Sequence, residues 1–430
     1  MRKLPVIAMA FGLAFGALPL VANAATPLSL DTAVALGLKQ NLEYARSLAH
    51  VDAIAAQFRQ ARAPKAPSLA LQDTYQYVNP VAALSTPMGA IPFSTVNATN
   101  VPLLALQYTL FDGGATAARA SAAAAGLSAA EASAQEARGA TIARVSKAYY
   151  DLAAALQLQS VAERGVAVAQ AHERDARTML AAGTIPRADL LRAQAELASE
   201  RVNAIQADNG VDLARVALDS VLDVPLDTVY TPTEPLDAPP PRVALASLLV
   251  SAHSARGELA AARFAVDAAR HAITAARAGG VPQVKATIAD GNTQPAVVGG
   301  YHNQFSLGLS AVWTLFDNGY TAGRVAEADA GLHDAQLSLA QMQNGVDVEV
   351  REAYLNLNEA AARVEAARDL VTYSDENLRL AQVRYRGGVG TALELQDAEL
   401  RDRTAQQTLT QSEAALRQSV VQLRYVAGLL

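Results

Sequence analysis

Few side chains in this sequence stand at the spacings that catalysis or ligand binding would need. The glycine-rich segment at residues 387–391 looks like a loop that could hold a phosphate, but it has no phosphate-binding lysine and no preceding strand. The six histidines are scattered without the spacing of a metal site, and there is no cysteine to act as a ligand or nucleophile. No nucleophile elbow and no acid and base constellation occurs either. The sequence therefore predicts a protein that is not an enzyme and that uses no cofactor and no metal.

The composition indicates a helical protein without a nucleic-acid partner. The 430 residues include 35 Lys and Arg against 41 Asp and Glu, a formal net charge of -6, so a basic surface that could replace counterions along phosphates is missing. Hydrophobic residues make up 51% of the chain, whereas aromatic residues make up only 5%. The apolar character must then come from Ala, Leu and Val, and a chain with much Ala and Leu and few aromatic rings is typical of helical proteins. We therefore expect a mainly α fold.

Residues 1–24 have the parts of a secretory signal peptide. Arg2 and Lys3 are positive, residues 4–20 are almost wholly apolar, and Ala22-Asn23-Ala24 is a small-x-small cleavage site. An uncleaved membrane anchor is the alternative interpretation. The mature chain would then work outside the cytoplasm. No later segment offers the roughly 20 consecutive apolar residues of a helical span, so we expect membrane entry only through a β-barrel.

The rest of the chain is a tandem duplication. The segment Leu110-Phe111-Asp112-Gly113-Gly114 recurs 205 residues later as Leu315-Phe316-Asp317-Asn318-Gly319. Gly183 and Gly388 are related by the same offset, whereas Glu43 and Glu258 are 215 residues apart, so the first copy carries an insertion. We predict a first structural repeat over residues 25–224, a proline-rich crossover over 225–242 and a second repeat over 243–430.

Each repeat begins with a predicted helix and a predicted β-hairpin. The helix has about 30 residues, over 30–62 and 243–278. Alternation of apolar and polar residues then predicts hairpins at about 68–111 and 283–316, with strands of about the length that crosses a membrane. Polar, turn-rich stretches that look like exposed loops separate the two strands of each hairpin, over residues 79–100 and 290–303.

A long helical hairpin completes each repeat. The segment from about 115 to 182 contains no proline and predicts one helix on the order of 100 Å long, by the rise per residue. The turns at the far tips are predicted near 183–189 and 387–394. A coiled-coil seam is indicated by the spacing of Val350, Tyr354, Leu357, Ala361 and Val364.

Four strands in one chain cannot close a barrel, and an open sheet in lipid would leave its edges unpaired. Three copies give twelve strands, which can enclose an aqueous lumen, whereas the interior of an eight-stranded barrel is filled by side chains. We therefore predict a homotrimer with a 12-stranded β-barrel in lipid. The long helices would continue it as an α-helical barrel.

Several motifs in this order resemble the TolC-like outer-membrane efflux proteins. They are the signal peptide, the duplication, the two Leu-Phe-Asp-x-Gly motifs, the Ala-Tyr-x-x-Leu pairs at Ala148 and Ala353, and the tip segment from Arg384 to Ala398. The resemblance covers nearly the whole mature chain. It implies a passive channel-tunnel in the cell outer membrane that extends into the periplasm. It also implies a periplasmic adaptor and an inner-membrane pump, proton-driven or ABC type, as partners in efflux or type I secretion.

A periplasmic coiled-coil adaptor or scaffold without a barrel is the alternative function. Long helices alone support it equally well. The strand segments argue against it, because such a protein has no use for hairpins that face lipid. The predicted strand-end motif consists of Leu110, Phe111, Asp112, Gly114, Leu315, Phe316, Asp317 and Gly319.

The resemblance also implies a gate at the hairpin tips. It assigns Asp189, Glu394 and Asp397 to the aperture, where three-fold symmetry would turn each into a ring of carboxylates that prefers cations. Alternatively, acids in a first helical turn only complement the helix dipole. Tyr385 matches the tip aromatic of the family, as a constriction or latch residue or as an aromatic packed between the two helices of its own hairpin.

The tips carry four further candidates. Arg192 is the repeat counterpart of Asp397, and the two could pair across neighbouring hairpins. Gly183 and Gly388 are expected to form the turns. Gly390 stands where some relatives carry a basic gate residue, so this chain departs from that pattern.

Overall fold

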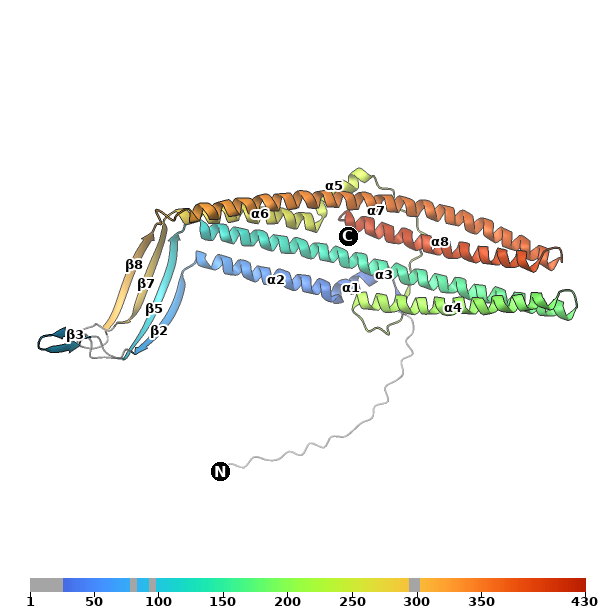
Figure 1. Cartoon of the computed structure of the whole chain (residues 1–430), viewed down its shortest axis with the longest axis horizontal. Coiled ribbons are helices and arrows are strands. Elements are labelled where there is room, and N and C mark those ends of the chain that lie inside the picture. Colours follow the sequence, from blue (N-terminus) through green and yellow to red (C-terminus); the bar gives the residue numbers. More distant parts are fainter. Residues whose placement is uncertain (1–25, 78–82, 93–97, 294–301) are drawn as a thin grey trace, which may run out of the picture.

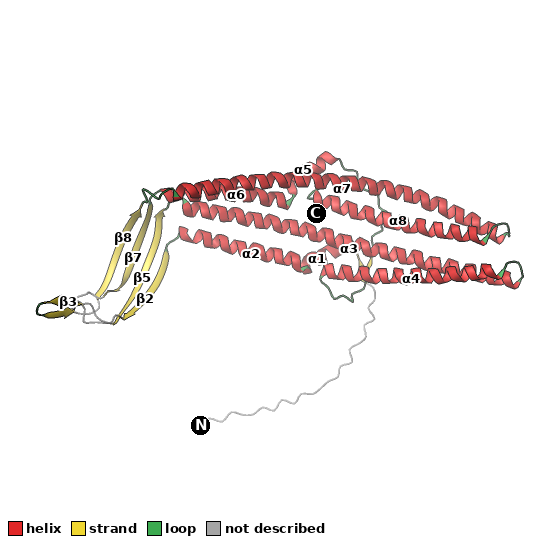
Figure 2. Ribbon diagram, in the orientation of Figure 1, coloured by secondary structure: helices red, strands yellow, loops and turns green. Residues whose placement is uncertain are grey.

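The computed structural model describes residues 26–77, 83–92, 98–293 and 302–430, so the predicted signal peptide over 1–24 lies outside the described residues. The protein is an elongated row of helices with a sheet at one end (Figures 1 and 2). The prediction of a mainly α fold is confirmed. Within the described ranges, no helix combines the length and the apolar character that a membrane span needs.

Both repeats contribute to one antiparallel sheet. Its order is β2-β5-β7-β8, so the hairpin of each repeat stays together and β5 pairs with β7 between the repeats. Among the described residues, the outer edges of β2 and β8 have no strand partner. The strands are β2 (Ser68–Tyr77), β5 (Ala98–Phe111), β7 (Gln283–Thr293) and β8 (His302–Val312).

Each strand of this sheet is joined in sequence to one long helix. The helices beside the sheet lie in the order α2-α3-α6-α7, which is the order of the strands they adjoin (Figure 1). Strand pairing therefore fixes which helices are neighbours. The helices are α2 (Leu42–Arg62), α3 (Ala115–Ala181), α6 (Gly257–Arg277) and α7 (Tyr320–Arg386).

Farther from the sheet, two returning helices replace α2 and α6. Helix α4 (Arg187–Leu222) packs on α3, and α8 (Ala392–Val426) packs between α3 and α7. The order there is α4-α3-α8-α7. Helices α4 and α2 thus follow one another end to end along the row, as do α8 and α6 (Figure 1).

The prediction of one opening helix over 30–62 and 243–278 is wrong, because a single residue interrupts each. Asn41 and Arg256 have extended backbone, with ψ of 119° and 122°, and each precedes the first residue of the next helix. The interruptions allow the shorter helices to turn aside and pack on the row. These shorter helices are α1 (Leu30–Gln40) and α5 (Leu245–Ala255).

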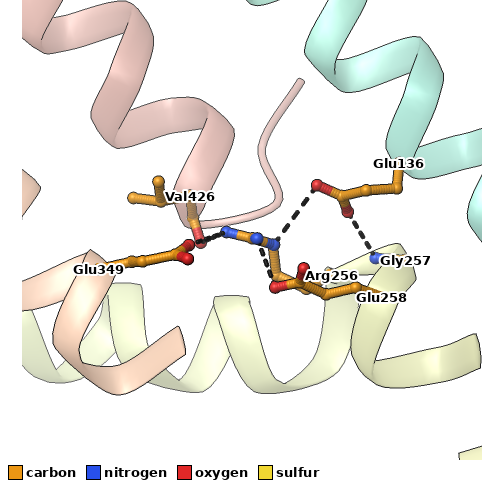
Figure 3. Close-up of polar contacts among 6 residues, drawn as sticks. All are labelled: Glu136, Arg256, Gly257, Glu258, Glu349 and Val426. Atoms are coloured by element: carbon orange, nitrogen blue, oxygen red, sulfur yellow. Dashed lines mark hydrogen bonds and ion pairs between the residues drawn. The ribbon is translucent and has the colours of Figure 1, made fainter. Parts of the chain in front are cut away.

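Arg256 is a buried arginine that joins four helices (Figure 3). Its side chain is 3% exposed, and its Nη1 donates to the carbonyl oxygen of Val426 at 3.2 Å, at the end of α8. The same nitrogen donates to Glu349 Oε2 of α7 at 3.1 Å, and Nε lies 3.6 Å from Glu136 Oε1 of α3. Glu136 also accepts from the backbone N–H of Gly257, at the start of α6. Burial raises the pKa of the third neighbouring acid, Glu258, although its pairing with Arg256 opposes that shift.

The first repeat has a corresponding junction, where α4 ends and α2 begins, and other residues pair its backbone groups. Asn41, the repeat counterpart of Arg256, donates from Nδ2 to the carbonyl oxygen of Val221 at 3.1 Å. The N–H of Leu42 donates to Asp223 Oδ2 at 2.9 Å. Buried helix ends leave unpaired backbone groups unless side chains reach them. Both junctions therefore supply a donor for the ending helix and an acceptor for the starting one.

The seam of α7 was predicted partly correctly. Val350, Leu357 and Val364 are buried in an apolar cluster with α8 and α5. Tyr354 and Ala361 lie only half-buried at its edge, and the buried seam passes through the alanines that precede them, Ala353 and Ala360. Small side chains let two long helices approach closely over many turns. The buried positions are Val346, Val350, Ala353, Leu357, Ala360 and Val364.

The proline-rich crossover contains a strand that the sequence did not indicate. Strand β6 (Tyr230–Pro232) pairs in parallel with β1 (Thr26–Leu28) at the start of the described chain. The hydroxyl of Tyr149, on α3, donates to the carbonyl oxygen of Leu28 at 2.9 Å and accepts from the N–H of Thr233 at 3.0 Å. This buried tyrosine attaches the crossover to the row of helices.

The predicted exposed loops over 79–100 and 290–303 are also corrected in part. The first contains a short hairpin of β3 (Ala83–Thr86) and β4 (Gly89–Pro92), and both loops lose residues at their ends to the long strands. Gly89 permits the tight hairpin turn because it has φ of 123°. The remaining parts of these loops lie outside the described residues.

Replacing Arg256 by Met should destabilise the fold strongly. The substitution leaves the carboxylates around the junction without their buried cation, and breaking a buried pair in this way costs about 3–5 kcal/mol. The matched control is Arg270→Met on α6, where Arg270 forms an exposed pair with Asp267 at 3.0 Å and its loss costs about 0–1 kcal/mol. Thermal unfolding of the purified protein, followed by its helical circular dichroism, measures both. Equal melting temperatures for the two variants would contradict the role of Arg256.

Candidate functional site

The aspartate of each strand-end motif caps the long helix that follows it. Asp112 accepts from the N–H groups of Gly114 at 3.0 Å and Thr116 at 2.7 Å. Burial raises the pKa of Asp112, but hydrogen bonds from Thr116 and Gly114 outweigh it and hold the pKa below its usual value. Asp317 accepts from Gly319 and Thr321 in the same way, at 3.0 and 2.8 Å. A carboxylate here satisfies N–H groups that the helix itself cannot pair.

The two residues after each aspartate adopt left-handed backbone, which explains the motif. Gly114 and Gly319 have φ of 83° and 85°, and the residues before them, Gly113 and Asn318, have φ of 67° and 52°. Glycine adopts this conformation without strain, and asparagine is among the few other residues that do so readily. The Asp-x-Gly pattern is therefore the local signal that turns an arriving strand into a helix.

The apolar part of the motif lies differently in the two repeats. Leu110 and Phe111 are the last residues of β5, as predicted for a strand end. The second hairpin was predicted to extend to residue 316, but β8 ends at Val312, so Leu315 and Phe316 follow the strand as exposed residues. Both pairs still lie at the boundary between sheet and helices.

The glycines at the tips have two different roles. Gly183 and Gly388 form the turns in left-handed conformation, with φ of 73° and 70°. Gly390 has no such conformation. A Cβ atom there would lie 3.0 Å from Arg384 Cβ and from the backbone nitrogen of Tyr385, so this position has to be small for the turn to close.

The charged residues at the tips find partners one helical turn away. Arg192 Nη1 lies 3.2 Å from Asp189 Oδ1 within α4, and Arg401 Nε lies 2.8 Å from Asp397 Oδ2 within α8. Within one chain, Arg192 and Asp397 therefore pair with other residues. Their pairing between chains stays a prediction.

Glu394 acts as a helix cap. The N–H of Glu394 donates to Thr391 Oγ1 at 3.1 Å, and the N–H of Thr391 donates to Glu394 Oε2 at 3.2 Å, so the two residues form a capping box. Arg384 Nη2 lies 3.7 Å from the same carboxylate. This geometry favours the helix-cap interpretation for Glu394 over aperture lining alone.

Tyr385 lies between the two hairpins of the chain rather than between the two helices of its own hairpin. Its side chain is 7% exposed, and its ring meets the His172 ring of α3 edge to face, with centroids 5.4 Å apart. Among the described residues its hydroxyl has no hydrogen-bond partner. Burial, together with the nearby Asp189, raises the pKa of that hydroxyl. Tyr385 therefore packs one hairpin against the other.

Comparison with known proteins identifies the family. The family model described as "Outer membrane efflux protein" matches residues 35–223 and 248–429, which is most of the chain and both repeats. The chain belongs to the outer membrane efflux protein family. The resemblance to TolC-like proteins is thereby confirmed.

Individual relatives agree with this assignment. Protein CyaE of Bordetella pertussis is 28% identical over 412 residues, covering 93% of this chain and 84% of CyaE. The proteases secretion protein PrtF of Dickeya chrysanthemi is 24% identical over 263 residues, covering 59% of this chain and 56% of PrtF. The crystal structure of the outer membrane protein VceC of Vibrio cholerae has the same fold, with a TM-score of 0.78 at 21% identity over 93% of this chain and 96% of VceC.

As an outer membrane efflux protein, the chain is a channel for efflux or secretion, located in the outer membrane and extending into the periplasm. OprN, another solved structure that this chain resembles, is described as an outer-membrane channel. In the part of the chain that the structure describes, no three His, Asp or Glu residues are grouped in a way that could hold a metal ion.

Sequence analysis missed a buried polar cluster near the tips of this outer membrane efflux protein. His172, Glu196, Glu200, Glu399 and Arg403 come together there from α3, α4 and α8. A comparison of the repeats contains the signal that could have found it. Glu200 falls on Ala405 at the offset of 205, so an acid stands in one repeat where the other has a buried alanine.

Gly114→Ala and Gly319→Ala should each destabilise the protein by about 1–2 kcal/mol, because left-handed backbone is strained for alanine. No atom lies within 4 Å of the added Cβ at either position, so steric clash does not contribute. The control is Gly126→Ala inside α3, which is equally open but has ordinary helical backbone and should gain about 0.5–1 kcal/mol. Melting temperatures of the three variants measure this. A gain at all three positions would contradict the capping role of the motif.

Selectivity measurements decide whether the tip acids line the aperture. If they do, the channel prefers cations, and Asp189→Asn, Glu394→Gln, Asp397→Asn together should abolish that preference. Asp212→Asn, which removes an exposed acid paired with Arg215 farther along α4, should leave it unchanged. Reversal potentials of reconstituted channels in a salt gradient provide the measurement. The same potential for the native and triple-variant channels would mean that these acids are only helix caps and local ion pairs.

Proposed function

We propose that three copies of the chain assemble into one channel, with a 12-stranded β-barrel in the outer membrane and an α-helical barrel in the periplasm. The observation that carries this proposal is the sheet, whose edge strands β2 and β8 both lack a partner among the described residues. In lipid, unpaired backbone groups at such edges cost several kcal/mol each. Pairing β8 of one copy with β2 of the next satisfies both edges.

The two faces of the sheet support this environment. Paired residues on neighbouring strands share a face, and one row of pairs crosses all four strands as Leu69, Leu106, Ile288 and Leu307. The adjacent row, on the opposite face, is Ser68, Gln107, Thr287 and Gly308. An apolar face toward lipid and a polar face toward a lumen are typical of membrane β-barrels.

The helices support closure around a common axis. Helices α4 and α7 lie at the two edges of the row in the described part of the chain, where α4 packs on α3 and α1, and α7 packs on α6, α8 and α5. Both carry large apolar side chains that are exposed in the single chain and that a neighbouring copy would cover. Examples on these two helices are Val202, Ile205, Leu213, Leu355, Leu370 and Leu380.

The channel has no energy source of its own in this proposal. A periplasmic adaptor and an inner-membrane pump, proton-driven or ABC type, would deliver the cargo to the hairpin tips, and no catalytic activity is needed. One relative, PrtF, is by its name a proteases secretion protein. A polypeptide is therefore the first cargo to test, with small-molecule efflux as the alternative.

The alternative function, a periplasmic adaptor or scaffold without a barrel, fits the sheet poorly. Leu307 of β8 is 73% exposed, and its neighbours in the same row would also face water in a soluble protein. Cell fractionation separates the two proposals. A heat-modifiable trimer in the outer membrane supports the channel, whereas a soluble periplasmic protein supports the alternative.

Leu307→Lys should prevent membrane assembly, whereas Ser306→Lys should not. Adjacent residues of a strand point to opposite faces, and a lysine facing the middle of the bilayer costs about 2–4 kcal/mol. The measurement is the amount of heat-modifiable trimer in the outer-membrane fraction for each variant. Equal losses for the two variants would contradict the proposed orientation of the sheet.

A further inference from the structure

The two helical hairpins of one chain meet near their tips through polar contacts as well as through the rings of Tyr385 and His172. Gln396 Nε2 of α8 donates to Glu196 Oε2 of α4 at 2.7 Å, and Arg164 Nη2 of α3 donates to Gln406 Oε1 of α8 at 3.2 Å. Contacts of this kind depend on charge and hydrogen bonding, so a change of protonation can weaken them.

One buried cation balances two acids in this interface. Arg403 of α8 pairs with Glu200 of α4, and its Nη1 lies 3.7 Å from Glu196 Oε1. Glu200 is 1% exposed, and Gly165 of α3 provides its space, because a Cβ there would lie 2.7 Å from Glu200 Oε2. A cavity of about 140 Å³ lies beside these groups and is also lined by Glu399. Arg403 is thus engaged by the two acids of α4.

Glu399 is the third acid of the interface and faces an imidazole. Its Oε2 lies 3.8 Å from His172 Nδ1 of α3, and both side chains are about nine-tenths buried. Burial, together with the charge of Glu196, raises the pKa of Glu399 to about 7. Burial lowers the pKa of His172, although Asp175 and Glu196 oppose that shift. Near neutral pH the imidazole is therefore an uncharged acceptor, and the carboxyl holds a proton part of the time.

We propose that Glu399 and His172 form a proton-dependent latch that holds the two hairpins of each chain together near the tips. With its proton, the carboxyl is neutral and faces an acceptor nitrogen that has no other partner among the described residues. Without its proton, it is a buried carboxylate beside Glu196. Separation of the hairpins then lets water reach the charge.

The sign of the pH dependence follows from the raised pKa of Glu399. A carboxyl whose pKa is higher in the joined state than in water stabilises that state when protonated, so the latch holds below about pH 7 and weakens above it. The other ionisable groups around the pair and its cavity are Arg164 and Asp175 on α3, Glu196 and Glu200 on α4, Tyr385 on α7, and Asp402 and Arg403 on α8. The useful window is pH 6 to 8, because protonation of His172 enters at lower pH.

Distances between spin labels test the latch without any assumption about conduction. The chain has no cysteine, so Thr178→Cys on α3 and Leu393→Cys on α8 place two labels specifically on the tip side of the latch. Between pH 6 and 8 the protonated fraction of a group with pKa about 7 falls from about nine-tenths to about one-tenth. Over the same pH range, the distance between the two labels of one chain should increase, or its distribution should broaden. Glu399→Gln, which is always neutral, should hold the short distance at both pH values.

Two further variants make the test specific. Glu196→Gln removes the charge that repels the Glu399 carboxylate, so the midpoint of the distance change should move to lower pH. Glu376→Gln removes an exposed acid that pairs with Arg379 on α7, so the native pH response should persist. A native distance that does not change with pH, or an unchanged response in Glu399→Gln, would overturn the latch.

The consequence for conduction rests on the proposed trimeric channel. If the latch restrains the aperture, conductance of the reconstituted channel should rise between pH 6 and 8, and Glu399→Gln should abolish the rise. A pH-dependent distance without any reconstituted conductance would support the latch and count against the channel proposal. Conductance that changes with pH equally in the native protein and in Glu399→Gln would overturn the latch as the cause.

Discussion

The structure depends on one constraint, which is that helix ends buried inside a long row must still pair their backbone groups. Where α8 ends and α6 begins, Arg256 donates to the carbonyl oxygen of Val426, and Glu136 accepts from the N–H of Gly257. Where α4 ends and α2 begins, Asn41 and Asp223 do the same. Because the backbone groups at both junctions are paired, α4 continues into α2, and α8 into α6, almost as single helices. The row therefore keeps a width of four helices over its whole length.

The order of the helices beside the sheet follows from the pairing of the strands. Strands β2, β5, β7 and β8 adjoin α2, α3, α6 and α7, so pairing of strands and packing of helices specify one and the same arrangement. The Asp-x-Gly turns after β5 and before α7 make this transfer possible, because they convert extended backbone into a capped helix within a few residues. A lumen that begins in the sheet can thus continue between the helices.

The tips are built on a different principle from the middle of the row. In the middle, Val350, Leu357 and their neighbours form an apolar seam that binds α7 to α8 within one hairpin. Near the tips, the two hairpins meet through Glu196, Glu399 and Arg403, whose contacts respond to charge. Apolar packing therefore holds each hairpin together, whereas polar contacts and the ring contact of Tyr385 with His172 join the two hairpins.

The sequence by itself determined the features that depend on neighbouring residues. The duplication, the proline-free long helices, the turns at Gly183 and Gly388 and the strands of alternating residues were all predictable, because each reflects local backbone preference or side-chain period. The breaks at Asn41 and Arg256 were not, since the carbonyl groups they satisfy belong to residues about 170–180 positions away. The meeting of Tyr385 with His172, and of His172 with Glu399, is equally remote in sequence. Only the tertiary structure decided these contacts, because the pairing of two distant helices, rather than any local pattern, chooses which polar groups are buried together.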